Sequence, residues 1–170
     1  MLDRLFKFIH WEIAVLIIIQ GLLGAANIRI PWLRAHLHEA IYVHEQIGVI
    51  ILLSTLLMLS IRLFSGRVSG HGTDLKTRLL ARLVHFSFYS LIFLECGIGI
   101  WMMGLLGLGM QILWWHFPLP ITPDKSLVFS EIIQLHALVA LVLAGLIVMH
   151  ASAALYHHFV LRDHVLRNML

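Results

Sequence analysis

The chain has 170 residues, of which 60% are hydrophobic and 12% charged, and its mean hydropathy is +0.91. Soluble proteins carry about 25% charged residues, so this composition excludes an ordinary soluble domain and indicates an integral membrane protein. The net charge of +3, from 12 Lys and Arg against 9 Asp and Glu, is too small to indicate nucleic-acid binding. We therefore expect membrane lipid, and no nucleic acid, around this chain.

Four apolar stretches follow one another along the chain, and each is long enough to cross the bilayer as a helix, which takes about 20 residues. They cover about residues 9–28, 41–64, 80–108 and 127–160. The pattern predicts an all-α, integral membrane four-helix bundle formed by one domain over residues 1–170. The first stretch is interpreted as a retained helix and not a signal peptide, because His10, Trp11, Glu12 and Gln20 interrupt its apolar run.

The basic residues predict the orientation of the bundle, since positively charged loops stay in the cytoplasm. Nine of the twelve lie on the side of the N-terminus, namely Arg4, Lys7, Arg62, Arg67, Lys76, Arg78, Arg82, Arg162 and Arg167. The other three, Arg29, Arg34 and Lys125, lie on the opposite side. We therefore expect both termini in the cytoplasm.

Twelve histidines are unusual in so apolar a chain, because histidine within a bilayer is costly and usually has a function. His136 and His150 are fourteen residues apart on the last span, nearly four helical turns, so they share one face at depths about 21 Å apart. The first span runs outward and the second inward. His10 is therefore expected near the inner surface, level with His150, and His44 near the outer surface, level with His136.

Two histidines that face each other at one depth are typical of six-coordinate haem in an electron-transfer bundle. The chain has no C-x-x-C-H motif, so a haem would be held noncovalently, as haem b is. These patterns predict two haem b groups stacked across the bilayer. His85, at the inner end of the third span, competes with His10 as the partner of His150, and spacing leaves both open. Structural histidines and a zinc site are less favoured alternatives, the latter for lack of clustered ligands.

Three further polar residues in the spans need an interpretation. His157 and His158 lie about two turns beyond His150, where they could serve a quinone headgroup or simply anchor the helix end at the interface. Glu95 lies in the middle of the third span, where a carboxyl group is either hydrogen-bonded within the bundle or part of a proton path. The sequence favours the structural role for Glu95 and leaves the two histidines open.

Several motifs resemble those of the prokaryotic cytochrome b561 family, within the wider group of diheme b subunits, and the likeness covers nearly the whole chain. Among the members of this family, the sequence most resembles the superoxide oxidase branch. The motifs are Ile9-His10-Trp11, Val43-His44 followed by Gly48, His85 with Tyr89, Leu135-His136-Ala137, the stretch 149–159 (MHASAALYHHF), Arg162-Asp163, and Leu166-Arg167-Asn168-Met169.

The resemblance implies a protein of the bacterial inner membrane whose haem iron has the axial ligand pairs His10 with His150 and His44 with His136. It also implies ubiquinone as the electron acceptor near the inner haem, where His157 matches a position associated with quinone binding. The implied reaction oxidises periplasmic superoxide to dioxygen and reduces ubiquinone. Arg29, Arg34 and Lys125 would then attract the superoxide anion to the outer surface.

Two other functions remain open at this stage. The chain could be the membrane electron-transfer subunit of a dehydrogenase or hydrogenase, with a protein as its electron donor. It could also be a haem-binding sensor or a structural protein. The sequence predicts neither extra helices nor an extended loop to seat a partner, and this favours the superoxide oxidase reading.

Overall fold

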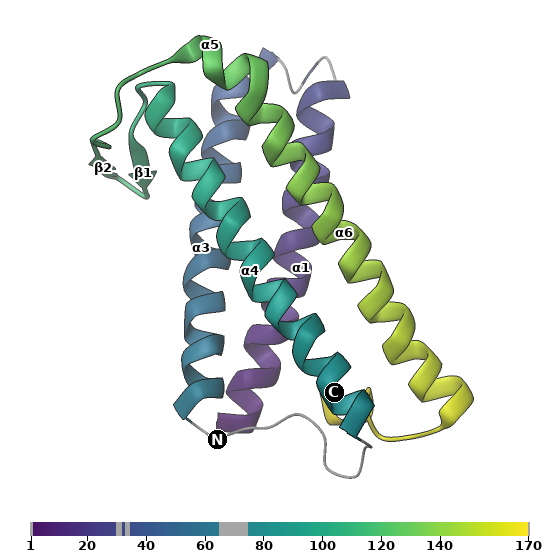
Figure 1. The fold of residues 1–170 in the computed structure, drawn as a ribbon. Helices are drawn as coiled ribbons and strands as arrows, with labels where there is room; N and C mark the ends of the chain where they lie inside the picture. The colour runs from purple at the N-terminus through teal and green to yellow at the C-terminus, as the bar shows by residue number, and fades with distance from the viewer. Residues whose placement is uncertain (1, 30–31, 33–34, 65–74, 170) are drawn as a thin grey trace.

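The computed structural model describes residues 2–29, 32, 35–64 and 75–169, with the backbone alone at 27–29. Four long helices form the molecule, and both ends of the chain lie at the lower end of the bundle in Figure 1. The helices are α1 (Leu2–Arg29), α3 (Leu37–Phe64), α4 (Leu75–Leu105) and α6 (Ile133–Tyr156). Helix α6 continues without a break from α5 (Lys125–Leu127) and the wide turn η1 (Val128–Ile132) into a second wide turn, η2 (His157–Leu161).

All four helices are long and apolar enough to cross a membrane. Most of their large apolar side chains are exposed; Leu22, Leu53, Leu94 and Leu141 are each more than half exposed. A soluble bundle would bury such a surface, whereas a bilayer covers it with hydrocarbon at no cost. The described part of the chain is therefore a four-helix membrane protein, as the sequence predicts.

The helix ends differ from the predicted spans for local reasons. Helix α1 begins at Leu2 and not at residue 9, because the charged residues around Asp3 and Lys7 continue the helix beyond the apolar stretch. Helix α4 ends at Leu105 and not at residue 108. Gly107 and Gly109 follow with φ of 72° and 68°, a left-handed conformation that stops a helix and that glycine adopts without strain.

The helices pack in pairs, α1 against α3 and α4 against α6, and α3 also contacts α4. Two apolar clusters hold them together. The first joins all four helices through Ile9, Ile13, Ile51, Ile61, Ile92 and Leu143. The second lies between α4 and the start of the last helix and contains Ile98, Leu105, Val128, Ile132 and Val139. These clusters fix how the helices are rotated, and so which side chains face the bundle interior.

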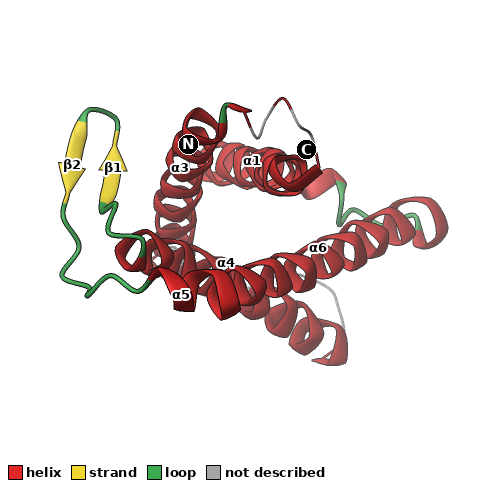
Figure 2. Ribbon diagram, turned by 90° about the horizontal axis from the view of Figure 1, so that it is seen from above, coloured by secondary structure: helices red, strands yellow, loops and turns green. Residues whose placement is uncertain are grey.

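A β-hairpin stands outside the bundle beside α3 and α4, as Figure 2 shows from above. Strand β1 (Met110–Ile112) pairs antiparallel with β2 (Trp115–Phe117), and Leu113 between them has a positive φ of 55°. Glu45 on α3 accepts a hydrogen bond of 2.6 Å from the Gln111 backbone N–H, which ties the hairpin to the bundle. The sequence predicted no extended element outside the bundle, and the hairpin corrects that expectation.

The C-terminal tail folds back to the start of α1. The turn after η2 is made by Arg162, whose φ of 54° is left-handed. The short helix η3 (Arg167–Met169) follows, and the Met169 carbonyl accepts a hydrogen bond of 2.8 Å from the Trp11 indole N–H. The tail therefore lies beside the part of α1 that carries His10.

Candidate functional site

The upper histidine layer, as oriented in Figure 1, consists of His44 on α3 and His136 on α6. Their ring centres are 6.1 Å apart and their planes are inclined at 68°. Both rings are partly buried, and each lies against a glycine of another helix. A Cβ at Gly24 of α1 would be 3.8 Å from His44 Cε1, and a Cβ at Gly99 of α4 would be 3.7 Å from His136 Cε1. At these two positions the lack of a side chain lets each ring lie close to the backbone of the neighbouring helix.

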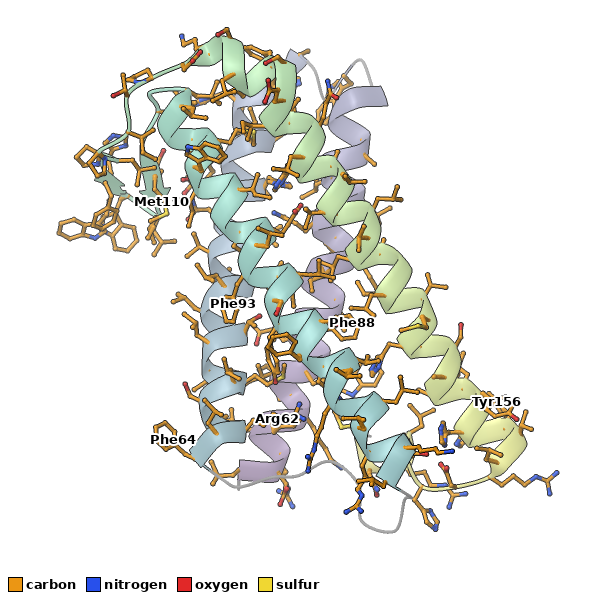
Figure 3. The ribbon with its side chains drawn as sticks, in the orientation of Figure 1. Arg62, Phe64, Phe88, Phe93, Met110 and Tyr156 are labelled. Carbon is orange, nitrogen blue, oxygen red and sulfur yellow. The ribbon has the colours of Figure 1, made fainter. Side chains whose placement is uncertain are left out.

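The lower histidine layer contains three rings. His10 on α1 has its ring centre 6.4 Å from that of His150 on α6, and His85 on α4 has its ring centre 5.9 Å from the same ring. Phe88, labelled in Figure 3, also projects from α4 against His150, with ring centres 5.3 Å apart. The structure thus brings together the two predicted pairs, and it also brings His85 into the lower layer.

Both predicted pairs have the spacing of two imidazoles that share one metal. Two imidazoles on opposite sides of a metal, each bonded at about 2.0 Å and with its ring centre about 1.1 Å farther out, have ring centres roughly 6 Å apart. The observed 6.1 Å and 6.4 Å agree with this value. The 5.9 Å between His85 and His150 agrees as well, so ring spacing does not distinguish His10 from His85.

The hydrogen bonding of the rings also fits metal ligation better than a purely structural role. Nδ1 of His10, His44 and His136 is buried and has no hydrogen-bond partner among the described residues. A structural histidine in a core is normally hydrogen-bonded, since an unsatisfied buried polar group costs about 1–3 kcal/mol. Nδ1 of His85 lies 2.6 Å from the Ala81 carbonyl oxygen of its own helix, an arrangement that metal-bound histidines commonly have and that leaves Nε2 free. By their spacing the four predicted residues fit a pair of haem groups bound between helices, and hydrogen bonding leaves His85 open as well.

A structural zinc site is not formed by the described part of the chain. No three His, Cys, Asp or Glu side chains gather there closely enough to hold a metal ion by themselves. Structural zinc takes four such ligands. The histidines instead face each other in pairs at two depths.

Three of the carboxyl groups within the spans have different partners. Glu12 accepts a hydrogen bond of 3.2 Å from the Ser54 hydroxyl, and Glu45 accepts one from the hairpin. Glu95 Oε1 lies 3.3 Å from Nδ1 of His136, across the α4–α6 contact. The structure thus places Glu95 beside a predicted ligand.

His157 and His158, the predicted quinone residues, lie in η2 at the lower end of the last helix. Nδ1 of His157 is 2.5 Å from Asp163 Oδ2, which lies just after the left-handed turn. This hydrogen bond, followed by one from the Val165 backbone N–H, lowers the pKa of Asp163 below its usual value. His158 Nδ1 is buried without a hydrogen-bond partner among the described residues. The sequence did not reveal the Asp163 contact, because it depends on the chain reversal at Arg162.

Comparison with known proteins adds the family to this geometry. Residues 2–170 match the family described as prokaryotic cytochrome b561. The chain belongs to that family. It is 28% identical over 166 residues to a protein of Escherichia coli (strain K12) named cytochrome b561 homolog 2, a match that covers 95% of this chain and 86% of the relative. The chain is therefore a multi-pass electron-transfer cytochrome of the bacterial inner membrane, and its family implies haem b.

The predicted superoxide-steering residues lie at the upper end of the cytochrome, as far as the structure describes them. Lys125 is exposed at the start of α5. Arg29 ends α1 with its side chain undescribed, and Arg34 lies outside the described residues. Asp124, next to Lys125, accepts hydrogen bonds from Ser126 and Leu127 that lower its pKa, so it is a carboxylate at neutral pH. The negative charge of Asp124 partly cancels the positive charge of Lys125 beside it.

Proposed function

We propose that this cytochrome binds two haem b groups and carries electrons across the inner membrane, from superoxide on the periplasmic side to ubiquinone on the cytoplasmic side. The observation that carries the proposal is the pairing of histidines at two depths of one bundle. His44 faces His136 at 6.1 Å in the upper layer, and His10 faces His150 at 6.4 Å in the lower layer. Sites at two depths allow electron transfer between the two surfaces in steps.

The lower end of the bundle is the proposed cytoplasmic end. Nine of the twelve basic residues belong to that side of the sequence, and both termini lie there in Figure 1. The upper histidine layer then lies nearer the periplasm and the lower layer nearer the cytoplasm. This orientation assigns the hairpin to the periplasmic surface.

The proposed ligands have distinct tasks in the chain. His44 and His136 hold the upper haem, and His10 and His150 hold the lower one. When bound, haem b supplies a one-electron carrier at each depth. Hydrogen bonding does not exclude His85, because the contact of its Nδ1 with the Ala81 carbonyl leaves Nε2 free for a metal. His10 is preferred because Ile9-His10-Trp11 resembles the family's first helix.

The lower end is the proposed quinone site. Asp163 holds Nδ1 of His157, which leaves Nε2 of that ring as the nitrogen for a quinone carbonyl. His158 lies beside it, and its Nδ1 has no hydrogen-bond partner among the described residues. In the proposed reaction two superoxide anions lose one electron each and leave as two molecules of dioxygen. Ubiquinone gains those two electrons and two protons from the cytoplasmic side to become ubiquinol, with His157 as a proton donor.

At the upper end, Arg29, Arg34 and Lys125 are the proposed residues that attract superoxide. Positive side chains raise the local concentration of an anion and its rate of encounter. Asp124 reduces this effect near Lys125, so we assign the larger share to the end of α1 and the segment after it. The substrate assignment rests mainly on the resemblance to the superoxide oxidase branch.

A second candidate function is an electron-transfer subunit that receives electrons from a protein partner. The hairpin favours it, because an extended element outside the bundle is what a subunit needs to seat a partner. Trp114 and Trp115 in this hairpin are 79% and 62% exposed. Aromatic side chains also anchor proteins at the membrane interface, which explains the same exposure without a partner.

The deciding experiment is stopped-flow mixing of the purified, oxidised protein with a pulse of superoxide, followed by haem absorbance with and without ubiquinone. Fast reduction, followed by reoxidation only when ubiquinone is present, supports the proposed function. Superoxide dismutase in the mixing buffer should abolish the reduction. If superoxide gives no reduction while ubiquinol or dithionite still reduces the haems, the partner-fed subunit is the correct function.

A further inference from the structure

Glu95 stands out among the acidic residues of the spans because of its contact with a proposed haem ligand. Its side chain is 17% exposed and that of His136 is 19% exposed, and Glu95 Oε1 is 3.3 Å from His136 Nδ1. Glu95 Oε2 and His136 Nδ1 are both buried without a hydrogen-bond partner among the described residues. Among the described residues Glu95 Oε2 and His136 Nδ1 each lack a hydrogen-bond partner, and the carboxyl group lies within reach of the ring nitrogen.

Helix packing fixes this contact. Glu95 and Gly99 are one turn apart on α4, so they share a face, and Gly99 lies beside His136 Cε1. Cε1 and Nδ1 are neighbouring ring atoms, so Glu95 and Gly99 lie against the same edge of the His136 imidazole. The cluster with Ile98 and Val139 packs α4 against α6 near this point. A buried carboxyl group here would be costly without a partner, and His136 is the partner that the packing supplies.

We propose that Glu95 is a positioning residue for His136, accepting a hydrogen bond from its Nδ1–H. This bond would fix the tautomer whose free lone pair is on Nε2 and orient the ring toward the iron. It would also make His136 a stronger electron donor, since a carboxyl partner raises the basicity of a ligating histidine. The consequence is a lower midpoint potential for the upper haem, which favours onward transfer to the lower one. The inference rests on the proposed ligation by His136.

The two upper ligands differ in this respect. His44 Nδ1 is buried without a hydrogen-bond partner among the described residues. No carboxyl group among them contacts the His44 ring as Glu95 contacts that of His136. Gln20 of α1 donates a hydrogen bond of 2.8 Å to the His44 backbone carbonyl and not to its ring. Glu95 therefore acts on one axial ligand of one haem, and its effect should be confined to that haem.

The test is a spectroelectrochemical measurement of both midpoint potentials in Glu95→Leu and Glu95→Gln, with Cys96→Ala as the matched control. Cys96 is the next residue of α4 and contacts the Gly48 carbonyl on α3. In Glu95→Leu the midpoint potential of the upper haem should rise by about 59 mV or more, a tenfold change in a one-electron equilibrium. The midpoint potential of the lower haem should stay unchanged. Glu95→Gln keeps an acceptor oxygen and should shift less, and Cys96→Ala should shift neither midpoint.

Haem content separates this inference from the proposed function. If His136→Ala keeps both haems, the proposed ligation fails. If His136→Ala loses one haem but Glu95→Leu leaves both potentials unchanged at full haem content, the ligation stands and the role of Glu95 is overturned. Equal shifts of both midpoints would also overturn it. Loss of one haem in Glu95→Leu but not in Glu95→Gln would support it, because Gln keeps an acceptor oxygen that Leu lacks.

Discussion

The imidazole rings of His85 and His150 lie 5.9 Å apart, which is close enough for both to bind one metal. His10 lies at a similar distance, 6.4 Å, from the same ring. The two candidates differ in their hydrogen bonds. Nδ1 of His85 is 2.6 Å from the Ala81 carbonyl oxygen, whereas Nδ1 of His10 is buried without a partner among the described residues. Because the ring distances are so similar, the partner of His150 has to be identified by measuring the haem content of variants.

Replacing His10 with alanine should leave one haem per chain, whereas replacing His85 should leave two. Loss of an axial ligand removes the bond that holds the lower haem, while His44 and His136 still hold the upper one. The measurement is haem per protein in the purified variants, together with their optical spectra. His116→Ala is a control, because His116 is an exposed residue of the hairpin.

A reversed result, with one haem in His85→Ala and two in His10→Ala, would make His85 the partner of His150. One haem in both variants would mean that the lower layer needs both rings. Two haems in both would leave His150 without either partner and would break the lower assignment.

Replacing His44 with alanine should remove the upper haem and separate the two surfaces functionally. The remaining lower haem should still be reduced by ubiquinol, because the quinone site is at the same end of the bundle. Superoxide should reduce it at least tenfold more slowly, which corresponds to an increase of about 1.4 kcal/mol or more in the activation free energy. Stopped-flow traces with each reductant measure both rates. Unchanged reduction by superoxide would show that this donor does not use the upper layer.

Much of the architecture was within reach of the sequence, because apolar runs of membrane length and a fourteen-residue histidine spacing are properties of single helices. The four helices and the two facing pairs follow from these patterns. The rotation of α4 against α6 does not, since it depends on packing in the cluster with Ile98 and Val139. The sequence therefore could not show that Glu95 faces His136, and helical spacing alone left His85 and His10 equivalent.

Contacts across chain reversals were also out of reach. The hairpin depends on a left-handed Leu113 and on hydrogen bonds that its backbone N–H groups donate to Gln46 and Glu45, which are more than sixty residues away in the sequence. Each strand has three residues, which is too short for the alternating apolar and polar pattern that identifies a strand. The contact of His157 with Asp163 depends on a left-handed Arg162 in the same way.

His157→Ala should keep both haem spectra and slow the reduction of ubiquinone, and Asp163→Asn should do the same to a smaller extent. Asparagine still occupies the position but lacks the charge that holds Nδ1 of His157. The measurement is the rate of haem reoxidation by ubiquinone after a reducing pulse. His164→Ala, a neighbouring exposed residue of the tail, is the matched control.

The pH dependence of this contact has a definite sign. The pKa of Asp163 is lowered in the folded chain, so the stabilisation is present above the carboxyl group's unfolded pKa and is lost as pH falls through the lower folded value. Asp163 thus stays ionised from about pH 5 upward. The difference in the rate of haem reoxidation by ubiquinone between the native protein and Asp163→Asn should therefore persist when the pH is lowered to about 5.

If His157→Ala leaves the rate of ubiquinone reduction unchanged, His157 is not part of the quinone site.

Gly104→Ala should destabilise the cytochrome by roughly 1–3 kcal/mol, the usual effect of overpacking. Gly104 is buried on α4, and a Cβ there would be 2.9 Å from Ile121 Cβ and closer still to Ile121 Cδ1. Thermal unfolding in detergent, followed by loss of the haem spectrum, measures the effect. Gly97→Ala is the matched control on the same helix, because a Cβ at Gly97 meets nothing within 4 Å. Equal stabilities for the two variants would mean that the segment around Ile121 yields freely; otherwise Gly104→Ala combined with Ile121→Ala should recover part of the loss.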